Sequence, residues 1–121
     1  MFTEAFPIVT VPSIATACEF YVGLLGFRLT YAYPPEGDPD FVVVRLGASE
    51  LGLGLDPLAA PADALELCVY ADDCDRAVAT LRSAGVLVVE EPSDQAWGER
   101  MARVLDPAGN RVMIVSRDEK N

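Results

Sequence analysis

Two stretches of the chain end in the same way: residues 20–27 read Phe-Tyr-Val-Gly-Leu-Leu-Gly-Phe, and residues 77–86 read Ala-Val-Ala-Thr-Leu-Arg-Ser-Ala-Gly-Val. In both stretches apolar residues recur at helical spacing, and a glycine follows the last of them. Glycine readily adopts the left-handed conformation that ends many helices, so Gly26 and Gly85 are predicted helix stops. The two glycines lie 59 positions apart, and similar segments surround them, which indicates an internal duplication.

The first half of the chain is predicted to contain one strand, one helix and three further strands. Ser13 is a suitable N-cap, and apolar residues at helical spacing follow it up to residue 20. The strands flank this helix, at residues 6–11, 28–31, 41–46 and 50–55. The order of elements is therefore β-α-β-β-β.

The second half repeats this order. It has a predicted helix over residues 72–84, with strands at 65–70, 86–89, 100–105 and 111–116. Residues 90–98 are predicted to form a loop, and residues 106–110, Asp-Pro-Ala-Gly-Asn, a turn. We therefore expect a single domain over residues 1–121, with module one at about 5–57, a linker at 58–63 and module two at about 64–117.

The charge balance excludes several classes of function. The chain has 121 residues, 19 Asp and Glu against 9 Lys and Arg, a net charge of −10 and no histidine. Without histidine there is no Ser-His-Asp or Cys-His nucleophile and no imidazole base. A phosphate backbone would be repelled, so nucleic acid is not an expected partner. Such a charge attracts cationic ligands, although it could also serve solubility alone.

Cellular location is predicted from apolar runs and cysteines. No apolar run approaches the roughly 20 residues that cross a bilayer, so we expect no membrane partner. The first residues, Met-Phe-Thr-Glu-Ala-Phe, lack the basic start of a secretory signal. Three cysteines cannot all pair with one another, and reduced thiols in the cytoplasm are the simplest interpretation.

Several spaced motifs resemble the vicinal oxygen chelate superfamily. They cover nearly the whole chain and comprise Pro7-x-Val9, Phe20-Tyr21-x-x-Leu24-Leu25-Gly26-Phe27, Tyr70-x-Asp72-Asp73, Trp97-Gly98-x-Arg100 and Asp106-Pro107-x-Gly109-Asn110. The resemblance implies the glyoxalase/bleomycin resistance fold, an α+β fold in which two tandem βαβββ modules form an eight-stranded, cup-shaped mixed sheet. It also implies a homodimer whose ligand sites are shared between subunits. Glyoxalase I, extradiol dioxygenases and fosfomycin-modifying enzymes of this family use a divalent metal, whereas bleomycin resistance proteins bind a drug without chemistry.

The resemblance also indicates where the metal ligands of the enzymes would lie. The corresponding positions here are Phe6 or Pro7, Glu66, Met113 and either Gly52 or Gly54. Glu50 shares the face of these glycines and could substitute only if the register is off by two, so at best two carboxylates remain of four ligands. Phenylalanine and glycine side chains cannot bind a metal, and a thioether is unsuited to a hard divalent ion. A catalytic divalent site normally needs about three protein ligands, so we expect no metal and no cofactor.

The residues with the most specific case for ligand binding are Glu66 and Trp97. Strand alternation places Glu66 on one face with Cys68 and Tyr70, and the resemblance implies that this face lines the cup. Glu66 could equally be an exposed acid at the start of a strand. Trp97, the only tryptophan, follows a run of acids and suits a planar or cationic ligand, although it could serve packing alone.

The other candidates complete an expected binding surface. Phe6, Phe41 and Met113 could form an apolar cup floor or simply part of the core. Tyr31 precedes a proline-rich, acidic loop at residues 34–40 that is either a lid or a solvated turn. Arg111 has the same strand parity as Met113 and is predicted to reach into the cup and pair with Glu66, for ligand binding or for structure.

The leading hypothesis is a metal-independent, non-catalytic protein that sequesters a small cationic or aromatic compound, such as an antibiotic, in a cleft of a homodimer. The alternative is a glyoxalase-type isomerase or lyase, with a divergent metal site or with Glu66 as a general base. A third hypothesis is a module with an empty cleft that acts only through protein contacts.

Overall fold

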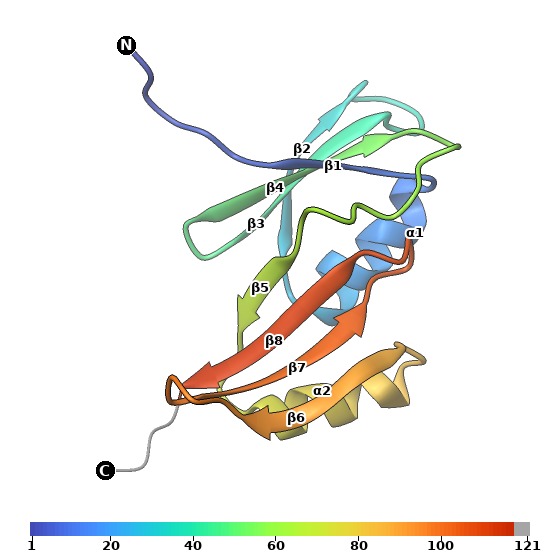
Figure 1. The fold of residues 1–121 in the computed structure, drawn as a ribbon. Coiled ribbons are helices and arrows are strands. Elements are labelled where there is room, and N and C mark those ends of the chain that lie inside the picture. The colour runs from blue at the N-terminus through green and yellow to red at the C-terminus, as the bar shows by residue number, and fades with distance from the viewer. Residues whose placement is uncertain (118–121) are drawn as a thin grey trace. The chain divides into compact units, whose positions relative to one another are not determined.

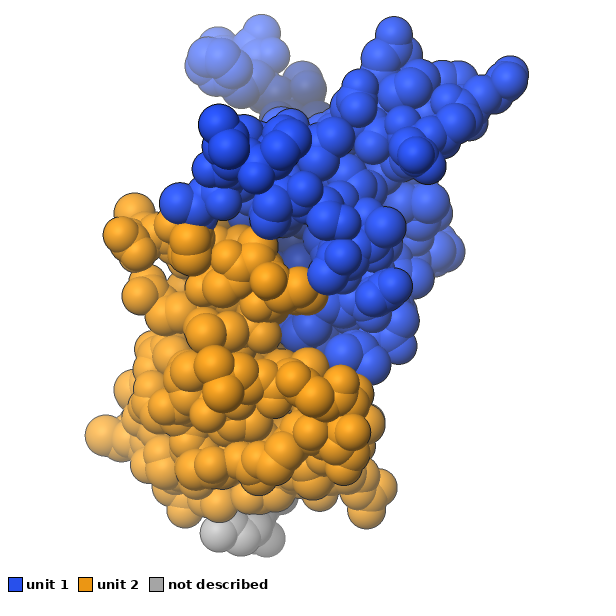
Figure 2. Space-filling view, turned by 90° about the vertical axis from the view of Figure 1, so that its right-hand side faces the viewer, with its two compact units in different colours: residues 1–60 blue, residues 61–121 orange. Residues whose placement is uncertain are grey.

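The computed structural model describes residues 1–117. The chain divides into two compact units, residues 1–60 and 61–121 (Figure 2). Each unit has the order strand, helix, three strands (Figure 1). The predicted α+β class and tandem βαβββ architecture are therefore confirmed, and the eight strands form two separate four-stranded sheets.

The first unit starts with β1 (Ile8–Val11) and a helix that changes pitch, α1 (Ile14–Cys18) continuing as the π-helical η1 (Glu19–Leu24). The Ser13 side chain accepts a hydrogen bond from the backbone N–H of Thr16, which fits the predicted N-cap. Gly26 adopts a φ of +87° just after the helix, so it serves as the predicted stop.

Three strands complete this unit, β2 (Arg28–Tyr33), β3 (Phe41–Leu46) and β4 (Ser49–Leu55). The sheet order is β1-β4-β3-β2, with β1 parallel to β4 and the other pairs antiparallel.

The second unit repeats the arrangement with β5 (Leu67–Tyr70), α2 (Cys74–Ser83), β6 (Val88–Asp94), β7 (Glu99–Leu105) and β8 (Arg111–Arg117). Its sheet order is β5-β8-β7-β6. The Asp73 side chain caps α2 by accepting from the backbone N–H of Arg76. Gly85 follows with a φ of +91°, so both helices end at the glycines that the sequence predicts.

Each sheet has one face covered by the helix of its own unit, and we call the opposite face the open face. In the second unit the buried Cys74 of α2 contacts β8, through Sγ to the Ile114 carbonyl and through its backbone N–H to Ser116 Oγ. Alternation along β8 therefore directs Met113 and Arg117 to the open face. Charged side chains can lie there without entering the apolar core.

One predicted loop is wrong. Residues 90–94 were expected outside any strand, but β6 continues through them to Asp94. β6 is an edge strand, and its register against β7 shifts on either side of Glu90. Pro92 is tolerated there because a proline at a sheet edge removes no hydrogen bond to a second neighbouring strand.

The helices are short. In residues 1–117, α2 has ten residues and the continuous helix of α1 and η1 spans residues 14–24, whereas crossing a bilayer takes about 20. No helix of the described residues is long and apolar enough to span a membrane.

Candidate functional site

The candidate site is built on the open face of the second sheet. The register places Cys68 of β5 beside Met113 of β8, and Met113 beside Arg103 of β7. Tyr70 lies two residues further along β5, on the same face as Cys68. Polar and apolar side chains therefore share this face, as in many ligand sites.

Arg103 organises one cluster on this face by bridging two carboxylates. Its Nε donates to Glu66 Oε2 at 2.5 Å, and its Nη1 donates to Glu90 Oε1 at 2.6 Å. The hydrogen bonds to these two carboxylates raise the pKa of Arg103 above its already high ordinary value, so this side chain stays charged. The three groups together carry one net negative charge.

The predicted pairing of Arg111 with Glu66 is wrong. Arg111 donates through Nη2 to the backbone carbonyl of Asp63 at 2.8 Å. The Glu66 carboxylate is bonded instead to Arg103. Arg103 lies on β7, and β8 stands between β7 and β5 in the sheet. Alternation along β8 indicates the face of Arg111, but a long side chain can still turn toward a loop.

A second cluster centres on Glu99, at the start of β7. One of its oxygens, Oε1, accepts from Trp97 Nε1 at 2.8 Å, and the other, Oε2, accepts from the Tyr70 hydroxyl at 2.8 Å. This hydrogen bond to Glu99 raises the pKa of Tyr70 above its ordinary value. One carboxylate therefore holds two aromatic side chains, and Trp97 remains 63% exposed.

A polar depression of about 520 Å³ adjoins this cluster at the end of the second sheet. Its walls come from the start of α2, the β6–β7 turn and the ends of β7 and β8: Asp72, Asp73, Asp75, Asp94, Gln95, Gly98, Glu99, Arg100, Ser116 and Arg117. A smaller hollow of about 280 Å³ is lined by Tyr70, Ala71, Asp72 and Arg117. Acidic groups outnumber basic ones in the larger depression, which favours cations there, whereas the smaller hollow has one of each.

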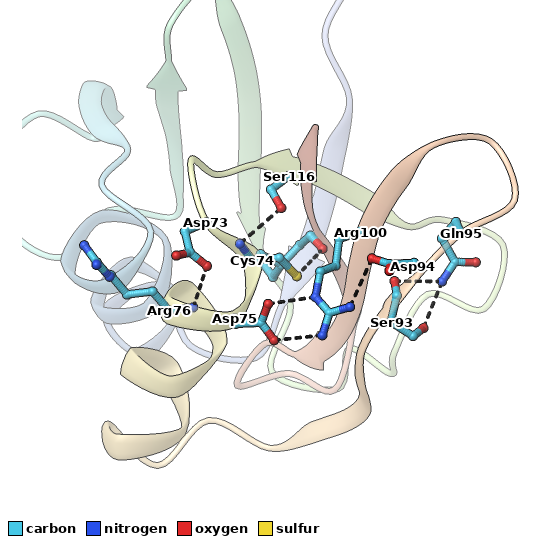
Figure 3. A network of polar contacts seen from close by, with 10 residues as sticks. Asp73, Cys74, Asp75, Arg76, Ser93, Asp94, Gln95, Arg100 and Ser116 are labelled. Atoms are coloured by element: carbon cyan, nitrogen blue, oxygen red, sulfur yellow. Dashed lines mark hydrogen bonds and ion pairs between the residues drawn. The ribbon is translucent and has the colours of Figure 1, made fainter. Parts of the chain in front are cut away.

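Two acids of the depression, Asp75 and Asp94, already have a partner in Arg100 (Figure 3). Arg100 donates to Asp75 at 2.7 and 3.1 Å and to Asp94 at 3.1 Å, tying α2 to β6. The hydrogen bond from Arg100 lowers the pKa of Asp75 below its ordinary value. These contacts hold the Asp75 and Asp94 carboxylates in place in the wall of the depression.

The Cys68 thiol is protonated at neutral pH. Partial burial and the nearby carboxylates of Glu99 and Glu66 all raise its pKa. Because the thiolate is the nucleophilic form, Cys68 is a poor nucleophile.

The open face of the first sheet carries apolar and aromatic side chains as well as the ion pair of Arg45 and Glu50. Phe41 and Ile8 cover Gly52, where an added Cβ would lie 3.1 Å from Phe41 Cε1 and 3.0 Å from Ile8 Cγ1. The Tyr31 ring meets Phe41 edge-on, with 6.2 Å between the ring centroids. Phe6 is exposed and precedes β1. The structure therefore brings Tyr31 and Phe41 together.

Sequence reasoning missed Arg103, Glu90 and Glu99. Arg103 and Glu99 share the parity of Met101 on β7, but their partners come from other strands. Glu99 also lies two residues from Trp97, and this short spacing across a turn is the one sequence signal that pointed to it.

The residues at the family's metal positions do not fit a divalent ion. Among Phe6, Gly52, Glu66 and Met113, only Glu66 offers a hard oxygen ligand, and its carboxylate is bonded to Arg103. Within residues 1–117 no group of three or more Cys, Asp or Glu side chains is arranged to hold a metal.

Each unit is a βαβββ module whose sheet has a helix on one face and an open face on the other. The chain is therefore a protein of two paired βαβββ modules. The family model of the Glyoxalase/Bleomycin resistance protein/Dioxygenase superfamily matches residues 5–114. The chain belongs to this superfamily, as its sequence motifs indicate.

Several solved structures resemble the chain over nearly its full length. A member from Sphaerobacter thermophilus is 25% identical and superposes with a TM-score of 0.78, over 97% of this chain and 99% of that one. TioX from Micromonospora sp. ML1 is 19% identical, with a TM-score of 0.77 over 95% and 99% of the two chains. Lactoylglutathione lyase from Agrobacterium tumefaciens is 20% identical, with a TM-score of 0.72 over 95% and 94%. No curated protein matches the chain by sequence.

Proposed function

We propose that this protein binds a small cationic or aromatic compound, such as an antibiotic, without a metal and without chemical conversion. Binding lowers the free concentration of the compound, so the protein acts by sequestration. The proposed ligand-contacting residues are Phe6, Tyr31, Phe41, Glu66, Trp97, Arg111 and Met113.

The observation that carries this proposal is the exposure of the Trp97 ring together with its hydrogen bond. Its indole is largely exposed, yet its Nε1 is bonded to Glu99. An exposed ring with a fixed edge loses little conformational freedom when a planar ligand stacks on it. The carboxylate beside the ring adds attraction for a positive charge.

The charge of the chain supports a cationic ligand. The net charge of −10 favours approach of cations, and the Glu66–Arg103–Glu90 cluster keeps one uncompensated negative charge on the open face. Micromolar affinity needs about −8 kcal/mol, which stacked rings and a few partly desolvated charge contacts can supply.

Catalysis by Glu66 is less well supported. A general base must reach the proton that it removes, but the Glu66 carboxylate already accepts two hydrogen bonds from Arg103, at 2.5 and 3.4 Å. A substrate would have to displace this guanidinium first.

The proposed assembly is a homodimer in the cytoplasm. Cys18, Cys68 and Cys74 are all free in the structure, which fits a reducing compartment. Native mass spectrometry of protein purified without chelator tests the assembly and reports bound mass together with it. We expect twice the 13.0 kDa chain mass and no metal; a monomer or a stoichiometric metal would overturn the respective part of the proposal.

Fluorescence of the single tryptophan tests the binding itself. We expect N-methylacridinium to quench Trp97 saturably, whereas acridine, at a pH where it is uncharged, binds more weakly. Trp97→Leu, followed by dye fluorescence, should weaken binding about two- to thirty-fold, the equivalent of roughly 0.5–2 kcal/mol. Non-saturable quenching, or equal affinity in Trp97→Leu, would refute the assignment of Trp97.

A further inference from the structure

The ring of Tyr70 already carries a cation. The guanidinium carbon of Arg117 lies 3.9 Å from the Tyr70 ring centroid. Tyr70 ends β5 and Arg117 ends β8, and these strands are parallel neighbours with Tyr70 opposite Val115. The two side chains therefore meet diagonally on the open face.

Glu99 fixes the ring that the guanidinium covers. The hydroxyl of Tyr70 is bonded to Glu99 Oε2, and Glu99 stands directly opposite Arg117 in the β7–β8 register. The second oxygen of the same carboxylate holds Trp97. A planar cation thus rests on an aromatic face beside a carboxylate, which is the chemistry that recognises guanidinium and amidinium groups.

The contact between Arg117 and Tyr70 is open to exchange. Tyr70 is 45% exposed and Arg117 is exposed as well. Both line the hollow of about 280 Å³, and Arg117 also borders the larger depression. An incoming ligand can therefore reach the ring by moving one flexible side chain, with no change in the backbone.

We propose that the Tyr70 ring is a recognition surface for a planar amidinium or guanidinium group, and that Arg117 occupies this surface until a ligand displaces it. Glu99 acts as a positioning residue, since it orients both Tyr70 and Trp97. This inference rests on the proposed binding function and specifies the cationic group that the site accepts. A ligand must then displace Arg117 from the Tyr70 ring, which neutral compounds do not do.

The effect of removing Arg117 on the affinity for a cation can be estimated. An exposed cation–π contact changes an equilibrium by about two- to five-fold. Arg117→Ala should therefore bind a planar cation at least about two- to five-fold more tightly than the wild type. Arg28→Ala is the matched control, because it makes the same change in net charge at an exposed position of β2 in the other unit.

Benzamidinium is the probe, and benzamide is its uncharged counterpart of nearly equal shape. Titration followed by ¹H–¹⁵N NMR compares the wild type with the Arg117→Ala, Tyr70→Leu, Tyr70→Phe and Arg28→Ala variants. We expect tighter binding in Arg117→Ala only. Tyr70→Leu should weaken binding about five-fold or more, while Tyr70→Phe keeps the ring and stays within about two-fold of the wild type. Far-UV circular dichroism checks that each variant is folded.

The outcomes separate the inference from the proposed function. If benzamidinium binds the wild type and neither Arg117→Ala nor Tyr70→Leu changes its affinity, the assignment of the Tyr70 ring is wrong and the binding function stands. Equal tightening in Arg117→Ala and Arg28→Ala would also refute it, because the effect would then come from net charge alone. If no variant binds benzamidinium, the inference is overturned, and the N-methylacridinium titration of Trp97 decides whether the binding function falls with it.

Discussion

Removal of Arg103 should destabilise the protein more than removal of either acid that it contacts. Arg103 bridges Glu66 and Glu90, and the side chains of Arg103 and Glu66 are only 29% and 24% exposed. Arg103→Met keeps an unbranched side chain of similar length but leaves the two carboxylates facing each other without a cation. Glu66→Gln keeps an acceptor oxygen and leaves the bond between Arg103 and Glu90 intact.

The expected magnitude lies between two known limits. Exposed ion pairs contribute about 0–1 kcal/mol, whereas removing one partner of a buried pair costs about 3–5 kcal/mol. For these partly buried side chains we expect a loss of about 2 kcal/mol in Arg103→Met and about 1 kcal/mol in Glu66→Gln. The double variant should lose about 2 kcal/mol rather than the additive 3, a coupling of about 1 kcal/mol.

Urea unfolding followed by far-UV circular dichroism measures these free energies. Arg76→Met on α2 is the control, because it makes the same change in net charge on an exposed helix surface and should stay within about 0.5 kcal/mol of the wild type. The coupling should shrink in about 1 M salt, where the Debye length is about 3 Å. A coupling below about 0.3 kcal/mol at low salt would refute the reasoning, since Glu66 and Arg103 would then act independently.

Three further predictions follow from single contacts. Arg100 lowers the pKa of Asp75, so this pair stabilises the fold above the ordinary pKa of Asp and loses that effect as the pH falls through the lowered value. The urea midpoint of Arg100→Gln should therefore lie below that of the wild type at neutral pH and approach it in acid. A difference that stays constant with pH would contradict this. Glu99 raises the pKa of Tyr70. Spectrophotometric titration should therefore show a tyrosine with a raised pKa that Tyr70→Phe removes and Glu99→Gln shifts down, and an unchanged titration in Glu99→Gln would contradict the assignment. Gly23 and Gly26 both have open space where a Cβ would lie, but only Gly26 has a positive φ. In urea unfolding, Gly23→Ala should raise the free energy of unfolding by about 0.5–1 kcal/mol, and Gly26→Ala should lower it by about 1 kcal/mol. Changes of the same sign would be inconsistent with a conformational cause.

The sequence predicted the elements well where a local rule decides them. Ser13 caps the first helix, Gly26 and Gly85 follow the two helices in the left-handed conformation, and β3 spans the predicted residues. The prediction failed over residues 90–94, since Glu and Pro favour a loop locally while pairing with β7 keeps this edge in the sheet.

The candidate site was predicted only in part. Alternation identified the shared face of Cys68 and Tyr70, and the acids that precede Trp97 drew attention to this exposed aromatic residue. The sequence did not identify Arg103 as the partner of Glu66, because the two residues lie 37 positions apart and β8 separates β7 from β5, the strand that follows Glu66.

The sequence by itself thus determined the duplication, the element order, the shared face of Cys68 and Tyr70 and the acidic character of the protein. Those properties follow from spacing and composition, which are local. Only the tertiary structure decided that Glu99 joins Tyr70 to Trp97, that Arg103 neutralises Glu66 and that Arg117 covers the Tyr70 ring. Such contacts depend on strand order and register, because cross-strand neighbours come from distant parts of the chain and a shift of one residue exchanges every partner.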